Sequence, residues 1–333
     1  MAFRFSARTQ WEASEDGYAL ALRAARAAGL TLVDLTASNP TACGLRFDAE
    51  ETLGPLSHAA ALSYDPDPRG MRSAREAVAG YYADHGAAVA ADELILTTST
   101  SEAYSFLFRL LCDPGDEVLA AQPSYPLFDF LADLDDVRLK AYPLFYDHGW
   151  SIDLHSLEQA ITPRTRAVLV VHPNNPTGQY VSGSERAALQ ELCARRGLAL
   201  IVDEVFLDYR VAETAQARAN AVSFTAGEHA ALTFVLSGMS KIAALPQMKA
   251  SWVAVKDPAQ ARQEAMQRLE VIADTFLSMS APVQLALPHW LANRGEIQRQ
   301  ILERVRANWG QARDALGVRG WVGWSGRRAG IWC

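Results

Sequence analysis

The sequence predicts an α/β protein in which a mostly parallel sheet lies between two layers of helices. Short apolar segments typical of buried strands, such as 118–121, 167–171 and 198–202, alternate with segments of helical periodicity. Strands that are apolar on both faces are typical of a parallel sheet covered on both sides. With 333 residues, half of them hydrophobic, the chain is long enough for one large domain and a smaller one.

Composition and charge narrow the class of protein. The formal charge of −7 is not concentrated in any basic block, which argues against a nucleic-acid partner. No apolar run approaches the roughly 20 residues that a membrane-spanning helix needs, and the N-terminus lacks the apolar centre of a signal peptide. The scattered cysteines form no metal or redox motif, so we predict no metal site. We expect a cytoplasmic protein without membrane contact.

The first third of the chain combines helices with a polar turn. A helix is predicted over 14–28, ending before Gly29, followed by a short strand over 32–35. The strand leads into the turn TASNPT, in which Asn39 either contacts a ligand or caps the turn. A second helix is predicted over 71–84.

A run of hydroxyl residues follows the next predicted strand, which contains Leu94, Ile95 and Leu96. This run, Thr97–Ser101, precedes a helical stripe that ends near Asp113. A strand, a hydroxyl-rich turn and a helix together place free amide groups where an anion can bind. The same pattern is also that of an ordinary serine or threonine helix cap.

Similar polar turns follow the remaining predicted strands. QPSYP follows 118–121, HPNNPTG follows 167–171, DEVF follows 198–202 and SGMSK follows 232–236. A helix over 182–196 separates the middle pair. In parallel sheets the ligand lies at the carboxyl ends of the strands, so we expect these turns to form one site.

The last part of the chain is predicted to be mostly helical. Asp257 caps a helix that begins at Pro258, and a long helix spans 296–316. The C-terminal stretch RGWVGWSGRRAGIWC has neither helical nor strand periodicity.

Lys241 lies at the centre of LSGMSKIAALPQMKASW, directly after a buried strand. The small residues around it allow a ligand to approach the backbone closely, and a second lysine, Lys249, follows in the same stretch. Such a lysine is placed to form an imine with a carbonyl ligand. Taken alone, however, a lysine is far more often a solvated loop residue, so the assignment of Lys241 depends on the rest of the chain.

The motifs HPNNPTG, DEVF and SGMSK, in this order, resemble those of the class I/II pyridoxal-phosphate-dependent aminotransferases of fold type I, the aspartate aminotransferase superfamily. The resemblance covers approximately residues 30–309. It implies a large domain at 49–290 that binds pyridoxal 5′-phosphate. It also implies a smaller α+β domain built from 1–48 and 291–333, and a homodimer with shared active sites.

The resemblance also implies roles for individual residues. Lys241 would form a Schiff base with the cofactor, and Asp203 would pair with its pyridine nitrogen. Asn175 would donate to the ring's 3-oxygen or set the turn before Pro176, and Tyr125 would stack on the ring. Substrate would contact Asn39 and Asn175.

A second group of residues would bind the cofactor phosphate. They share hydroxyl or ammonium groups near the predicted strand ends, and they are Ser99, Thr100, Ser101, Ser237 or Ser240, and Lys249. Tyr64 matches a tyrosine that reaches the phosphate of the neighbouring subunit.

Three features depart from the family pattern. Lys249 stands where most members have arginine, which keeps the charge but loses the two-pronged guanidinium. Phe206 stands where many members have a tyrosine that donates to the 3-oxygen, so we expect a raised pKa of the Schiff base. The family also has a late arginine that binds the substrate carboxylate. Only Arg327 and Arg328 occur so late, in a different context, and we expect a truncated or altered C-terminal segment.

The predicted function is transfer of an amino group from an amino acid to a 2-oxo acid such as 2-oxoglutarate, with pyridoxal phosphate as cofactor. Two alternatives stay open. One is a lyase or decarboxylase on the same fold, because fold does not fix the reaction. The other is a pyridoxal-phosphate-binding protein with impaired catalysis. The identity of the amino-acid donor is not predicted.

Overall fold

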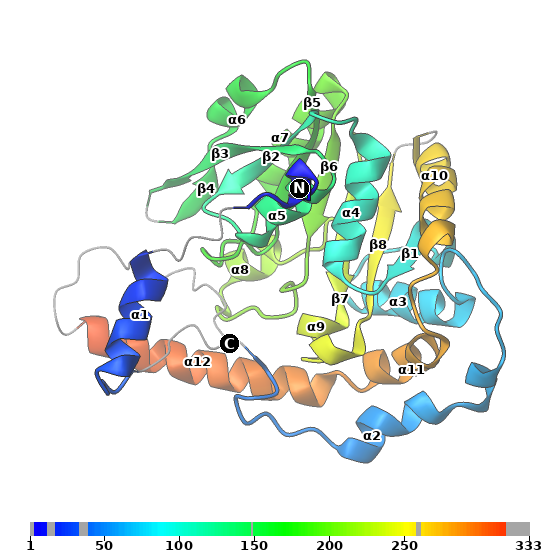
Figure 1. Ribbon diagram of the computed structural model, residues 1–333, viewed down its shortest axis with the longest axis horizontal. Coiled ribbons are helices and arrows are strands. Elements are labelled where there is room, and N and C mark those ends of the chain that lie inside the picture. The colour runs from blue at the N-terminus through cyan, green and yellow to red at the C-terminus, as the bar shows by residue number, and fades with distance from the viewer. Residues whose placement is uncertain (1–2, 12–16, 33–38, 148, 258–260, 318–333) are drawn as a thin grey trace.

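The computed structural model describes residues 3–11, 17–32, 39–147, 149–257 and 261–317. Its centre is an 8-stranded sheet in the order β1-β8-β7-β6-β5-β2-β3-β4, with helices on both faces (Figure 1). The predicted α/β class and the three-layer arrangement are confirmed.

The strands run almost entirely in one direction. Their bounds are β1 Leu94–Thr97, β2 Glu117–Gln122, β3 Arg138–Tyr146, β4 Trp150–Ile152, β5 Thr165–Val171, β6 Ala199–Asp203, β7 Thr233–Gly238 and β8 Ser251–Lys256. Strands β3, β2, β5, β6 and β7 pair in parallel, whereas β8 is antiparallel to both β1 and β7. The carboxyl ends of β1, β2, β5, β6 and β7 therefore meet at one edge, beside the beginning of β8.

Each face of the sheet has its own apolar core. One face, with Ile201, Phe234 and Val253, packs against α4 Thr100–Leu111, α5 Leu127–Leu134 and α10 Ala261–Phe276. The other face packs against α3 Arg72–Asp84, α6 Leu154–Ala160, α7 Gly183–Arg196, α11 Ala281–Ala292 and α12 Gly295–Gly317. The shorter helices are α1 Gly17–Ala27, α2 Ala49–Leu53, α8 Ala215–Asn220 and α9 Met239–Ile242. Single turns of 3₁₀ helix occur at Ala7–Thr9, Gly54–Ser57, Ala59–Leu62, Ala91–Glu93 and Pro246–Met248.

Helix α7 shows how the local sequence sets the bounds of an element. The Ser182 hydroxyl accepts a hydrogen bond from the Glu185 amide, and the Glu185 carboxylate accepts one from the Ser182 amide, which forms a capping box. The helix ends at Gly197, whose φ of 64° lies in the left-handed region that glycine adopts most easily. The prediction of a helix over 182–196 is confirmed to within one residue.

Other predicted elements either differ from the structure or lie outside the described residues. Strand β8 lies partly inside the stretch that we interpreted as a ligand-binding turn, and β3 and β4 were not predicted. The predicted strand at 32–35, the helix start at Pro258 and the C-terminal stretch fall wholly or mostly outside the described residues.

The segment before α2 lies along α12. The Arg46 amide donates to the Gln300 side chain at 2.9 Å, and the Arg304 guanidinium donates to the Cys43 carbonyl. In Figure 1, α12 runs along the lower edge of the sheet, beyond α9. Over the part of the chain that is described, no helix has both the length and the apolar character needed to cross a membrane.

Candidate functional site

A cavity of about 380 Å³ lies at the carboxyl edge of the sheet. Its walls come from the turns that follow β1, β2, β5, β6 and β7, and from the beginning of β8. It is lined by Thr98, Ser99, Thr100, Ser101, Tyr125, Phe128, Val171, Asn175, Asp203, Val205, Phe206, Ser240, Lys241, Pro246, Lys249, Ala250 and Ser251. The turns that the sequence placed at strand ends thus surround one cavity.

The hydroxyl run forms the N-terminal turn of α4. The Ser99 hydroxyl accepts a hydrogen bond from the Glu102 amide at 3.1 Å, so Ser99 caps the helix. The Thr98 amide donates to the Glu102 carboxylate at 2.7 Å. The amides of Thr100 and Ser101 have no acceptor within the helix, because the first turn never does. Both interpretations of the run therefore hold: it caps the helix and it presents amides at the cavity.

Asp203 ends β6 and is 7% exposed. Its carboxylate accepts hydrogen bonds from the Tyr104 hydroxyl at 2.8 Å and from the Val205 amide at 3.0 Å. Burial raises the pKa of Asp203, while these two hydrogen bonds and the charge of Lys241 act in the opposite direction. The carboxylate is thereby fixed in orientation at the cavity wall.

Lys241 lies in α9, immediately after β7. Its Nζ is 5.5 Å from the centre of the Phe206 ring, within the range of a cation–π contact. The Tyr209 hydroxyl donates to the backbone carbonyls of Lys241 and Ile242, which fixes this short helix to the chain that follows Asp203.

The other lysines differ in their surroundings. Lys249 lines the same cavity and adopts a φ of 54°, which is uncommon for a residue with a side chain. Lys140 donates to the Ala160 carbonyl, and Lys256 pairs with Glu93, both away from the cavity. Lys241 and Lys249 are therefore the lysines that can act in this site.

The two asparagines of HPNNPTG have different roles. The buried Asn174 donates to the Thr177 hydroxyl at 2.9 Å and to the Pro123 carbonyl at 3.3 Å. Asn175 lines the cavity, and its side chain makes no hydrogen bond to another described residue. Setting the turn thus falls to Asn174, and the Asn175 amide remains available to a ligand.

Tyr125 lies at the mouth of the cavity and is 44% exposed, so it is not a core tyrosine. Its ring meets Phe128 edge to face, with 5.7 Å between the ring centres. This contact sets the ring's orientation and leaves the rest of it accessible.

Ser237 does not reach the cavity. Successive side chains of a strand point to opposite faces of a sheet. Ser237 pairs with Trp252, which belongs to the core on the other face, whereas Gly238 pairs with Ser251 on the cavity face. Of the two serines that we considered, Ser240 lines the cavity and Ser237 does not.

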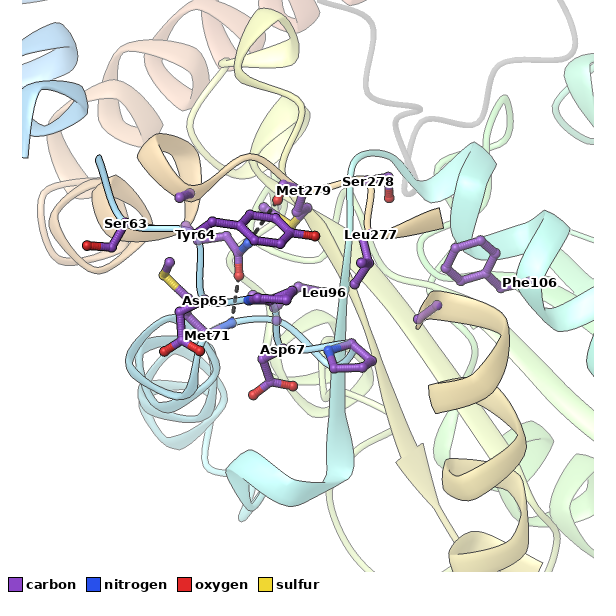
Figure 2. A pocket seen from close by; sticks show the side chains of 16 residues that line it. Ser63, Tyr64, Asp65, Asp67, Met71, Leu96, Phe106, Leu277, Ser278 and Met279 are labelled. Carbon is purple, nitrogen blue, oxygen red and sulfur yellow. Dashed lines mark hydrogen bonds between the residues drawn. The ribbon is translucent and has the colours of Figure 1, made fainter. Parts of the chain in front are cut away.

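Two further predicted residues lie outside this cavity. The Asn39 side chain accepts hydrogen bonds from the amide and hydroxyl of Thr41, as a turn cap does. Tyr64 is 83% exposed and lines a separate pocket of about 80 Å³ together with Leu277 and Met279 (Figure 2). Arg327 and Arg328 lie outside the described residues.

Three residues at the site were not predicted. Tyr104 lies in the stripe of α4, where its spacing is that of any core residue. Tyr209 follows DEVF with no pattern of its own, and Ser251 is the first residue of an unpredicted strand. Their roles depend on contacts between elements, which sequence periodicity does not reveal.

The cavity has the size and the groups that pyridoxal phosphate requires. Its volume lies within the usual range for small-ligand pockets. It combines a buried carboxylate, an asparagine amide, an exposed aromatic ring, two lysines and the amides of a helix N-terminus. These groups match the cofactor's pyridine nitrogen, 3-oxygen, ring face, aldehyde and phosphate, respectively.

The family comparison covers most of the chain. Residues 57–322 match the family of aminotransferases of class I and II. The chain belongs to this family, whose members use pyridoxal phosphate. The predicted family and cofactor are thereby confirmed.

Two relatives with known names share about a quarter of their aligned residues with this chain. Nicotianamine aminotransferase 1 of Oryza sativa is 26% identical, over 75% of this chain and 50% of the relative. Glutamate-pyruvate aminotransferase AlaA of Escherichia coli K12 is 24% identical, over 87% of this chain and 72% of the relative. The chain thus spans only half the length of the rice relative.

Solved structures show the same fold. An alanine aminotransferase from Pyrococcus furiosus superimposes with a TM-score of 0.80 at 22% identity, covering 95% of this chain and 79% of the other. A mutant aspartate aminotransferase from Thermus thermophilus gives a TM-score of 0.73 at 26% identity, covering 95% and 80%. The relatives' names include alanine, tyrosine and nicotianamine aminotransferases, so they do not single out one substrate.

Proposed function

We propose that this chain catalyses the transfer of an amino group from an amino acid to a 2-oxo acid, with pyridoxal phosphate as cofactor. The observation that carries the proposal is the arrangement of Lys241, Asp203 and Asn175. They come from the ends of three strands and line one cavity. Membership in the aminotransferase family supports the same reaction.

When bound, pyridoxal phosphate supplies a ring that stabilises negative charge developing at the substrate's α-carbon. Asp203 would hold a proton at the pyridine nitrogen, and Tyr104 keeps the carboxylate in place. Asn175 would donate its amide to the 3-oxygen, and Tyr125 would stack on the ring. The Lys241 amine would hold the cofactor through its aldehyde carbon and move the proton at the α-carbon.

The residues at the N-terminus of α4 would bind the cofactor phosphate. The free amides of Thr100 and Ser101 and the hydroxyls of this turn provide hydrogen bonds to an anion, and Lys249 provides a positive charge. Ser240 adds a further hydroxyl. Because Lys249 lacks the fork of an arginine, the backbone amides carry more of the orientation.

Phe206 removes a possible hydrogen-bond donor from the site. Its ring lies beside the Lys241 ammonium and has no group that could donate to the cofactor. Of Asn175 and Phe206, only Asn175 would then offer the 3-oxygen a side-chain donor. We expect this oxygen's negative charge to be less stabilised than where a tyrosine also donates.

A homodimer is the proposed assembly, as predicted from the resemblance. Tyr64 is 83% exposed and Leu277, which lines the same pocket, is 38% exposed; Leu62, next in sequence to the pocket residue Ser63, is 92% exposed. A second copy would cover this surface and bring Tyr64 toward its neighbour's phosphate site.

Two further expectations stay proposals. The contacts of the 43–46 segment with α12 support a smaller domain built from 1–48 and 291–333. A cytoplasmic location rests on the sequence alone.

The function is tested by a single-turnover experiment. The purified protein is loaded with pyridoxal phosphate, mixed with a panel of amino acids and analysed for products. Formation of a 2-oxo acid together with pyridoxamine phosphate supports amino transfer. Release of carbon dioxide or of an eliminated group would instead identify a decarboxylase or lyase. An unchanged spectrum with every amino acid would identify a cofactor-binding protein without catalysis.

A further inference from the structure

Ser251 begins β8 between two strands whose ends border the cavity. It pairs with Thr97 of β1 on one side and with Gly238 of β7 on the other. Residues directly opposite each other on neighbouring strands project to the same face of the sheet. Asp203 pairs with Leu236, two residues before Gly238, so Ser251 projects to the same face as Asp203.

The Ser251 hydroxyl occupies space that a side chain at position 238 would need. A Cβ added to Gly238 would lie 2.2 Å from Ser251 Oγ and 2.9 Å from the Ala250 carbonyl oxygen. Both distances are too short for real contacts. The glycine is required here for space, since its φ of 178° is open to any residue. Gly238 and Ser251 therefore form a matched pair, in which one residue lacks a side chain and the other fills the gap.

The Ser251 hydroxyl also lacks a partner in the described part of the chain. Ser251 is 2% exposed and lines the cavity, yet its hydroxyl makes no hydrogen bond to another described residue. Because the Ser251 hydroxyl borders the cavity, a ligand there can bind it, whereas the buried and unpartnered hydroxyl of Ser237 lies on the other face of the sheet. Lys249 and the hydroxyl turn at the start of α4 line the same cavity. This combination favours an anionic partner.

We propose that Ser251 donates its hydroxyl to the phosphate group of pyridoxal phosphate, and that Gly238 leaves the space in which this hydroxyl lies. Ser251 would thereby supply a hydroxyl in addition to Ser240, whereas Ser237, the alternative to Ser240, lies on the other face of the sheet. The proposal rests on the proposed function, because it presupposes that the cavity holds this cofactor. It adds a phosphate ligand contributed by the antiparallel strand of the sheet.

The test compares binding of pyridoxal phosphate with binding of pyridoxal, which lacks the phosphate. Dissociation constants are measured for both compounds by absorbance titration of the cofactor-free protein. In Ser251→Ala, affinity for pyridoxal phosphate is expected to fall about tenfold or more, since the hydroxyl binds a charged group. Affinity for pyridoxal is expected to stay unchanged.

Two further variants sharpen the result. Ser237→Ala removes a hydroxyl from the neighbouring strand on the opposite face, and it is expected to leave the ratio of the two affinities as in the wild type. Gly238→Ala displaces the Ser251 hydroxyl and is expected to lower the ratio as Ser251→Ala does. If Ser251→Ala does not fold by circular dichroism, Ser251→Cys, which keeps the volume, takes its place.

The outcomes separate this proposal from the proposed function. A wild-type protein that binds neither compound would overturn both. A wild-type protein that prefers pyridoxal phosphate, with the same preference in Ser251→Ala, would overturn the role of Ser251 alone. An equal loss of affinity for both compounds would show a structural role and would also overturn it.

Discussion

At the scale of single residues, Asp203 depends on a group that sequence patterns did not reveal. Its carboxylate is buried, which raises its pKa, and the Tyr104 hydroxyl stabilises the charged form across 2.8 Å. Hydrogen bonds to charged groups contribute about 1.5–3 kcal/mol. Tyr104 therefore helps to keep Asp203 ionised in a setting that disfavours charge.

Tyr104→Phe is expected to raise the pKa of Asp203 further. The carboxylate then gains its proton at a higher pH, so affinity for pyridoxal phosphate begins to fall at a higher pH than in the wild type. Titration of cofactor binding from acid to neutral pH measures this shift. Tyr142→Phe is the matched control, since Tyr142 is also buried but donates to the Leu169 carbonyl. If the affinity for pyridoxal phosphate fell at the same acid pH in Tyr104→Phe and in the wild type, the role of Tyr104 would be contradicted.

Glu204, the next residue, belongs to the fold and not to the cavity. Its carboxylate accepts hydrogen bonds from the Phe224 amide and, at 2.7 Å, from the Ser223 hydroxyl. Burial raises the pKa of Glu204 to about 7. A folded-state pKa above the unfolded value gives a contribution to stability that is complete at acid pH and is lost as the pH rises through about 7.

Glu204→Gln is expected to remove this pH dependence. The free energy of unfolding of the wild type, relative to that of the variant, should fall between about pH 5 and pH 8, by on the order of 1–3 kcal/mol. Urea unfolding at both pH values gives the comparison. A constant difference between the two proteins would show that Glu204 does not titrate in this range.

At the scale of elements, the segment from Glu204 to Tyr209 follows β6 in the chain and is hydrogen-bonded to α9. The Tyr209 hydroxyl donates to the carbonyls of Lys241 and Ile242, and Tyr209 is almost fully buried. These bonds fix the short helix that carries Lys241. The positions of Asp203 and Lys241 are thereby coupled through one segment of chain.

Tyr209→Phe is expected to slow the reaction of Lys241 with pyridoxal phosphate by about tenfold and to lower stability by about 1–3 kcal/mol, because buried carbonyls lose their donor. Stopped-flow absorbance gives the rate. The control is Tyr180→Phe. The Tyr180 hydroxyl donates to the Leu207 carbonyl at 3.1 Å, so this variant removes a hydrogen bond to the same segment but not one to α9. Equal rates in the two variants would refute a specific role for Tyr209.

The elements also show what sequence reasoning can reach. Strands β2, β5, β6 and β7 were predicted because runs such as 167–171 are apolar on both faces, and α7 because its caps are explicit. Strand β8 was missed because it follows directly on the turn around Lys249, so one stretch contains two elements. The choice between Ser237 and Ser240 stayed open for the same reason: the face of a serine is known only once the strand's register is known.

At the scale of the whole molecule, no described part of this chain covers the surface around Tyr64. Leu62 and Tyr64 are almost fully exposed, and Leu277 lines the same pocket as Tyr64. Exposed apolar groups gathered in this way are typical of an interface. The resemblance implied that Tyr64 reaches the phosphate site of a neighbouring subunit, but the sequence does not show where that subunit lies.

The chain is therefore expected to sediment as a dimer. Tyr64→Phe should leave the dimer intact and weaken pyridoxal phosphate binding several-fold, since it removes one hydrogen bond to a charged group. Tyr18→Phe, at an exposed tyrosine of α1, is the control. A wild-type protein that sediments as a monomer and binds pyridoxal phosphate no more tightly than Tyr64→Phe does would contradict a shared site.

The most direct measurement identifies the lysine that holds the cofactor. The protein is loaded with pyridoxal phosphate, reduced with borohydride, digested and analysed by mass spectrometry. The added mass is expected on Lys241, because its ammonium lies beside the Phe206 ring and it lines the same cavity as Asp203 at the strand ends. Addition to Lys249, Lys140 or Lys256, or to no lysine, would contradict the central role of Lys241.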